Sequence, residues 1–133
     1  MIRFLLDTSA CVDYLRGRTP GIRGRLRTST IDETGISSVT FAELAYGVAN
    51  SPTPDRNRRA TDELVGALAV LPFDFGAAAA YGRIRADLER AGAPIGPLDT
   101  LIAAHAVSLG ATLVTRNTRE FRRVSSLKLE DWS

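Results

Sequence analysis

Residues 2–9 read Ile-Arg-Phe-Leu-Leu-Asp-Thr-Ser, an apolar run that ends in an acid and two hydroxyl side chains. The run has the length and the composition of a strand, whereas Thr8 and Ser9 are residue types that commonly begin helices. The stretch therefore predicts a strand that ends at Asp7 and passes directly into a helix.

The same alternation continues along the chain. Apolar runs of strand length occupy residues 2–6, 36–39, 69–71 and 112–115, with a weaker one at 127–129. Stretches with helical periodicity lie at residues 10–16, 22–27, 41–49, 56–67, 77–91 and 98–109. Parallel strands need long crossover connections, so we expect an α/β fold. It should be a three-layer α/β/α sandwich with a small, mostly parallel sheet of four to five strands.

The composition suits one ordinary domain that spans residues 1–133, because 44% of the chain is hydrophobic. No run approaches the ~18 apolar residues of a membrane span, and the first apolar run is too short for a signal sequence. We therefore expect a cytoplasmic protein without membrane contact. A single cysteine, Cys11, excludes an internal disulfide. The basic residues are nearly all arginine, which suits phosphate binding but also fits a GC-rich coding sequence.

Asp7 is the first candidate for a functional site. It lies at the carboxyl end of the first strand, the edge at which open parallel sheets bind ligands. The alternative is that Asp7 only caps the next helix, since a carboxylate accepts hydrogen bonds from the free N–H groups there. The local sequence leaves both interpretations open.

Glu43 is the second candidate and has a strong structural alternative. Thr40 and Glu43 have the spacing of a capping box, in which the two side chains satisfy each other's backbone donors. Glu43 nevertheless lies near the start of a helix at the same sheet edge as Asp7, so its carboxylate could instead point toward Asp7.

Asp99 is the third candidate, at the start of a helix that is apolar on nearly every face. A carboxylate at the rim of a buried helix is costly unless a positive group meets it. His105, on the same helix, is better explained as a buried, hydrogen-bonded histidine than as a ligand.

The strand at residues 112–115 brings a fourth polar group to this edge. Thr115 and Asn117 can offer oxygen atoms to a cation, either as a weak fourth ligand or as support for the other ligands. Arg116 and Arg119 flank Asn117 and are candidates for contacts with a phosphate backbone. Three acids close together repel one another, and a divalent cation with a preference for oxygen ligands removes that penalty.

These segments resemble a known family when they are taken together. Residues 5–9, 37–47, 96–105 and 112–121, in this order and at this spacing, are similar to the PIN-domain family and specifically to the VapC-type toxin ribonucleases of bacterial toxin–antitoxin pairs. The resemblance covers essentially the whole chain. It implies a compact α/β/α fold, Mg²⁺ or Mn²⁺ as cofactor, cleavage of RNA and a homodimer. It also implies inhibition by a small antitoxin of VapB type, whose arm occupies the acidic groove.

The resemblance also implies roles for the three acids. Carried over by position, Asp7, Glu43 and Asp99 are the catalytic, metal-binding residues. A cation held by Asp7 and Asp99 would activate water for hydrolysis of the phosphodiester, while Glu43 helps to hold the metal or its water. The family often has a fourth acid near the last motif, a position that Asn117 occupies here. We therefore expect one firmly held ion and a second ion that arrives with RNA.

Two other functions compete with this one. Asp7 could be a phosphate-accepting residue of an aspartyl-phosphate phosphotransfer domain, although the only lysine of the chain is Lys128, near its end. The chain could also be a non-catalytic module that binds RNA or a protein with the same fold.

Overall fold

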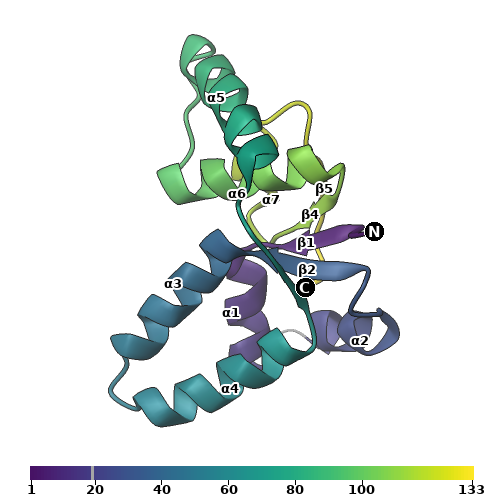
Figure 1. The fold of residues 1–133 in the computed structure, drawn as a ribbon, viewed down its shortest axis with the longest axis vertical. Helices are drawn as coiled ribbons and strands as arrows, with labels where there is room; N and C mark the ends of the chain where they lie inside the picture. Colours follow the sequence, from purple (N-terminus) through teal and green to yellow (C-terminus); the bar gives the residue numbers. More distant parts are fainter. Residues whose placement is uncertain (19) are drawn as a thin grey trace.

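The computed structural model describes residues 1–18 and 20–133, which form a five-stranded parallel sheet covered by helices (Figure 1). The strands lie in the order β3-β2-β1-β4-β5, so the first strand is central. Their bounds are Phe4–Leu6 for β1, Thr34–Ser37 for β2, Ala69–Leu71 for β3, Thr112–Val114 for β4 and Lys128–Glu130 for β5. All four pairings are parallel, so the predicted α/β fold and parallel sheet are confirmed.

Helices fill every connection between consecutive strands. The connection from β1 to β2 holds α1 (Thr8–Arg16) and α2 (Pro20–Thr28), and that from β2 to β3 holds α3 (Ser38–Ala49) and α4 (Pro54–Gly66). The connection from β3 to β4 holds α5 (Phe75–Arg90) and α6 (Pro97–Leu109), and the short α7 (Thr118–Phe121) precedes β5.

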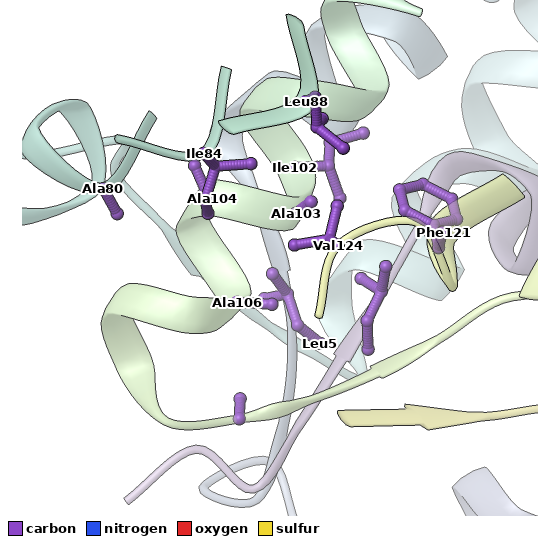
Figure 2. Packing of buried hydrophobic residues seen from close by; sticks show 12 residues of the cluster. Leu5, Ala80, Ile84, Leu88, Ile102, Ala103, Ala104, Ala106, Phe121 and Val124 are labelled. Atoms are coloured by element: carbon purple, nitrogen blue, oxygen red, sulfur yellow. The ribbon is translucent and has the colours of Figure 1, made fainter. Parts of the chain in front are cut away.

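Two hydrophobic clusters cover the two faces of the sheet. Leu5 points to the cluster of α5, α6 and α7, whereas the next residue, Leu6, points to that of α1, α2, α3 and α4. Successive strand residues face opposite sides of a sheet, which explains this division. Figure 2 shows the first cluster, in which Leu88 of α5 lies beside Ile102 of α6 above the sheet. The three-layer arrangement predicted from the sequence is therefore confirmed.

The strand and helix boundaries agree with the sequence patterns within a few residues, with one informative exception. The strand at residues 69–71 is found as predicted, whereas the strand predicted at 36–39 ends at Ser37. The helix predicted to begin at residue 41 begins at Ser38 instead, because the Ser37 hydroxyl caps it by accepting a hydrogen bond from the Val39 N–H at 3.1 Å.

None of the helices that the structure describes, outside residue 19, is both long and apolar enough to cross a membrane.

Candidate active site

Asp7 lies between the end of β1 and the start of α1, with a side chain that is only 2% exposed. Its Oδ1 accepts hydrogen bonds from the Ala10 N–H at 2.8 Å and from the Ser9 hydroxyl at 2.7 Å. Its Oδ2 accepts one from the Thr115 hydroxyl at 2.5 Å. Asp7 is thus the helix cap that the sequence allowed, and its carboxylate is also fixed at the carboxyl edge of the sheet. Burial raises the pKa of Asp7, and these hydrogen bonds oppose that rise.

Glu43 does not form the capping box that its spacing with Thr40 indicated. Because α3 begins at Ser38, Thr40 lies inside the helix and has no cap role. The Glu43 carboxylate accepts a hydrogen bond from the Thr8 hydroxyl at 2.6 Å, across 35 residues of sequence. Thr8 follows Asp7 directly, so the structure brings Glu43 to the site, as the second interpretation of its sequence predicted.

Asp99 lies in the first turn of α6 and is partly buried. Its pKa is raised to about 6, first by burial and then by the negative charges of Glu120, Asp7 and Glu43. Among the described residues, no protein group donates a hydrogen bond to the Asp99 carboxylate. The three acids predicted from the sequence therefore share one electrostatic environment, and Asp99 is the one whose two oxygen atoms accept no hydrogen bond from the described residues.

Glu120, on α7, is a fourth acid that the sequence analysis missed. Its Oε1 accepts a hydrogen bond from the N–H of Gly96, the residue that precedes α6, at 3.2 Å. This contact holds Glu120 next to the helix that carries Asp99. The signal that could have found Glu120 is its place three residues after Asn117, at the edge where the fourth acid was expected.

Thr115 and Asn117 differ in their suitability as ligands. The buried Thr115 hydroxyl donates to Asp7 and accepts a hydrogen bond from the Asn117 N–H at 2.9 Å. Its oxygen is therefore already used in orienting Asp7. The Asn117 side chain is exposed and does not cap α7.

Arg116 and Arg119 lie beside this edge, as predicted, but Arg116 also has a structural contact. Its Nε donates to Oδ2 of Asp13 at 2.9 Å, and the Asp13 side chain is only 3% exposed. The Arg116 side chain remains half exposed. Arg119 is exposed to solvent.

The acids have the donor chemistry that a divalent cation needs, but they are not arranged around one point as a complete set of ligands. The donor set consists of carboxylate oxygens, which Mg²⁺ and Mn²⁺ prefer. The raised pKa of Asp99 reflects burial first and then the negative charge of the neighbouring acids. Outside residue 19, the structure holds no group of three or more acids, histidines or cysteines close enough to surround one ion. Mg²⁺ usually needs only one or two carboxylates, with water and substrate phosphates as its other ligands, so we regard the donor set as suitable.

Two hollows flank Glu43. One, of about 670 Å³, is mainly apolar and lies between α3 and the start of α6, where Tyr46 and Leu98 line it. The other, of about 250 Å³, lies between α1, α3 and α4, with Val12 and Leu44 in its wall. Surfaces for a partner are therefore available directly beside the acids.

Comparison with known proteins agrees with this fold. Residues 4–127 match the family described as the PIN domain. Over its full length, the chain is 44% identical to the tRNA(fMet)-specific endonuclease VapC of Shigella flexneri and covers all of that protein. It is 37% identical over 130 residues to Ribonuclease VapC2 of Rickettsia felis, with 97% of each protein covered.

Solved structures give the same result. The chain superimposes on DNA-bound VapBC from Salmonella typhimurium with a TM-score of 0.95 and 41% identity, covering 100% of both chains. With VapBC-1 from nontypeable Haemophilus influenzae the TM-score is 0.89 at 33% identity, over 99% of this chain and 98% of that one. The chain therefore belongs to the PIN-domain family and, within it, to the VapC group.

Proposed function

We propose that the protein is a metal-dependent endoribonuclease, the toxin of a toxin–antitoxin pair, which acts in the cytoplasm. The observation that supports this proposal most is the gathering of Asp7, Glu43, Asp99 and Glu120 at one sheet edge, where burial and like charges raise the pKa of Asp99 to about 6. Such an edge repels RNA unless a cation neutralises it. The names of the VapC relatives, which are endonucleases and ribonucleases, support the same activity.

The proposed cofactor is Mg²⁺ or Mn²⁺, held by Asp7 and Asp99 with Glu43 in support. When bound, it supplies Lewis-acid stabilisation of the charge that develops on the phosphate, together with a more acidic water. In this proposal Glu120 is the fourth acid, which the sequence analysis had looked for at the position of Asn117. Its negative charge favours a second ion more than the neutral Asn117 side chain does.

The protein's own residues hold the acids in fixed positions. Ser9 and Thr115 donate to Asp7 from two sides, and Thr8 donates to Glu43. These bonds stabilise the charged carboxylates before RNA arrives, which reduces the rearrangement needed in the transition state. Asp99 keeps both oxygens available, so it is the residue best able to contact the cation and its water.

We also propose a small antitoxin as partner, with an arm that occupies the acidic groove. The similar structures are described as VapBC proteins, and one as a member of the VapBC family of toxin–antitoxin systems, which supports a second polypeptide. The hollow between α1, α3 and α4 ends at Glu43 and Arg16, so it offers an apolar wall with charged side chains at its rim. A chain bound there would cover one of the four acids.

We propose that two copies of the protein associate through the other hollow beside Glu43, which lies between α3 and the start of α6. Phe41 and Tyr46 on α3 and Leu98 on α6 are exposed, by 39%, 69% and 46% of their surfaces, and Tyr46 and Leu98 line the larger apolar hollow. Exposed aromatic side chains that gather in this way are typical of interfaces. Sedimentation equilibrium would test this assignment: we expect a dimer for the unchanged protein and a monomer for Tyr46→Glu. A monomeric unchanged protein would contradict it.

Cleavage of total cellular RNA is the direct test of the nuclease. We expect fragments with Mg²⁺ or Mn²⁺ and none with EDTA or with Asp99→Asn. Asp7→Asn should also abolish cleavage while preserving the fold, because asparagine caps helices as well as aspartate does. Asp32→Asn, at an exposed position outside the site, is the matched control and should cleave normally.

The same experiment separates the two competing functions. A non-catalytic module would bind RNA without cutting it, so intact RNA with Mg²⁺ would support that alternative. A phosphotransfer domain would form an acyl phosphate on Asp7 when given a small phosphodonor. The structure disfavours it, because Lys128 begins β5 at the amino edge of the sheet and donates to the Gly110 carbonyl at 3.2 Å, opposite the edge that carries Asp7.

A further inference from the structure

A basic hollow of about 310 Å³ opens next to the acids, on the side of α7. Its lining consists of three arginines, an asparagine and one acid: Arg116, Asn117, Arg119, Glu120 and Arg123. Three guanidinium groups and one carboxylate give the hollow a formal charge of +2, in contrast to the negative edge beside it.

Two of the three arginines are held in place by contacts that leave donors free. Arg116 uses Nε to bind the buried Asp13, and Arg123 donates from one terminal nitrogen to the Pro94 carbonyl at 2.8 Å. A guanidinium has five N–H donors, so each keeps most of them for another acceptor. For Arg119, no hydrogen bond or ion pair is found among the described residues. The arginines are therefore positioned for an anion that the protein itself does not supply.

Glu120 joins this hollow to the acids. It lines the hollow, and its charge contributes to the raised pKa of Asp99. The hollow thus begins where the acidic edge ends. An RNA strand with one phosphate at the acids must continue over one of the neighbouring surfaces. The arginine hollow is such a surface, and its positive charge is opposite to that of the RNA backbone.

We propose that the hollow of Arg116, Arg119 and Arg123 is a subsite for an RNA backbone phosphate adjacent to the phosphate that is cut. This inference rests on the proposed ribonuclease function. Guanidinium groups bind phosphate through parallel hydrogen bonds and do not read the base. The subsite therefore contributes affinity and strand position, and it favours polynucleotides over a dinucleotide that ends at the scissile bond.

The affinity for a labelled single-stranded RNA, measured in EDTA over a range of salt concentrations, reports the contribution of the arginines without that of the cation. We expect Arg119→Ala/Arg123→Ala to bind roughly three- to tenfold more weakly. The slope of log K against log salt should fall by about 0.7, the value for one lost phosphate contact on a single strand. Arg122→Ala is the matched control, since Arg122 is an exposed neighbour that does not line the hollow. Arg83→Ala on α5 is a second control.

Cleavage kinetics provide a second measurement. The double variant should show a raised KM for a long RNA with nearly unchanged kcat, and its KM for a dinucleotide should equal that of the unchanged protein. Equal affinity and salt slope in the double variant and the Arg122→Ala control would overturn the subsite, as would equal KM values for the long RNA.

The two proposals fail in different ways. If Mg²⁺-dependent cleavage occurs but the double variant keeps its KM and its salt slope, the nuclease stands and the subsite is wrong. If the unchanged protein never cleaves, yet the double variant loses affinity and salt dependence, the arginines bind an RNA phosphate but the nuclease is wrong.

Discussion

His105 and Ser37 lie 68 residues apart in the sequence, and Nδ1 of the histidine is 2.8 Å from the serine Oγ, with both side chains buried. Ser37 Oγ already accepts from the Val39 N–H, and no other acceptor for its own proton is found among the described residues. Ser37 therefore donates to Nδ1, and His105 is neutral with its proton on Nε2. Burial lowers the pKa of His105, which agrees with this form. The predicted buried, hydrogen-bonded histidine is confirmed.

This bond connects the start of α3 to the second half of α6, two helices that carry acids. Ser37 caps α3 six residues before Glu43, and His105 lies on α6 six residues after Asp99. We predict that Ser37→Ala lowers the free energy of unfolding by about 1–3 kcal/mol, because it removes the cap and leaves a buried ring nitrogen without a partner. Urea unfolding would measure this loss. Ser108→Ala, at an exposed position on α6, should change the midpoint little, and equal midpoints for the two variants would refute the prediction.

The pKa of Asp99 predicts a pH dependence of stability in the metal-free protein. Because the folded-state pKa of about 6 lies above the ordinary 3.8, the folded protein holds this proton more tightly than the unfolded chain does. The stabilising contribution is complete below pH 3.8 and is lost as the pH rises to about 6.

Asp99→Asn should remove this part of the pH dependence. We expect the variant to gain stability relative to the unchanged protein between pH 4 and pH 7, and Mg²⁺ to stabilise only the unchanged protein at the upper end. Thermal unfolding over this pH range is the measurement. Parallel stability curves for the two proteins would show that Asp99 does not titrate in this way.

The ion pair between Asp13 and Arg116 predicts an asymmetry between its two single variants. Arg116→Ala leaves the buried Asp13 carboxylate without its partner, whereas Asp13→Asn leaves a guanidinium that already reaches water. We expect Arg116→Ala to cost roughly 1–3 kcal/mol, reduced from the value for a fully buried pair because Arg116 is half exposed. Asp13→Asn should cost less. Equal losses in urea unfolding would contradict this account.

Thr34, in β2, has a buried hydroxyl for which no hydrogen-bond partner is found among the described residues. Replacement by valine keeps the shape and removes the unpaired polar group, so Thr34→Val should gain about 1 kcal/mol. Thr100→Val serves as the control, because the Thr100 hydroxyl donates to the Gly96 carbonyl at 2.8 Å and its loss should destabilise the protein. A Thr34→Val variant less stable than the unchanged protein in urea would show that the hydroxyl is satisfied.

Two glycines of α2 should respond in opposite directions to alanine. A Cβ on Gly21 would clash with the Trp132 carbonyl oxygen, so Gly21→Ala must displace the C-terminal segment. A Cβ on Gly24 meets no atom within 4 Å, and Gly24→Ala should stabilise the helix by about 0.5–1 kcal/mol. Trp132 packs on Phe4 with ring centroids 5.0 Å apart, so its fluorescence should report the displacement in Gly21→Ala alone.

Most of the fold could be predicted from the sequence because its signals are local. The alternation of short apolar runs with helical periods fixed the parallel sheet and its two helical layers. The start of α3 could not be read in the same way, since Ser37 and Thr40 are both good cap residues. The choice between them depends on His105, which lies on a different helix and whose contact no local pattern contains.

The site could be predicted only in part, for a similar reason. The carboxyl end of a strand identified Asp7, and acids near the starts of helices identified Glu43 and Asp99. The resemblance to a known family then assigned roles to all three. Glu120 lies in a short polar segment that resembles ordinary surface helix, and only its contact with Gly96 brings it to the acids. The structural role of Arg116 was missed because its partner, Asp13, is 103 residues away.

The central place of β1 has a consequence for the synthesis of the protein. Asp7 emerges among the first residues, but its neighbour strand β4 and the Thr115 that fixes its carboxylate come near the end of the chain. Glu120 follows later still. A ribosome that makes this protein therefore completes nearly the whole chain before the four acids can assemble. An incomplete product that stops before β4 would lack both Thr115 and Glu120, and its acids could not form the site.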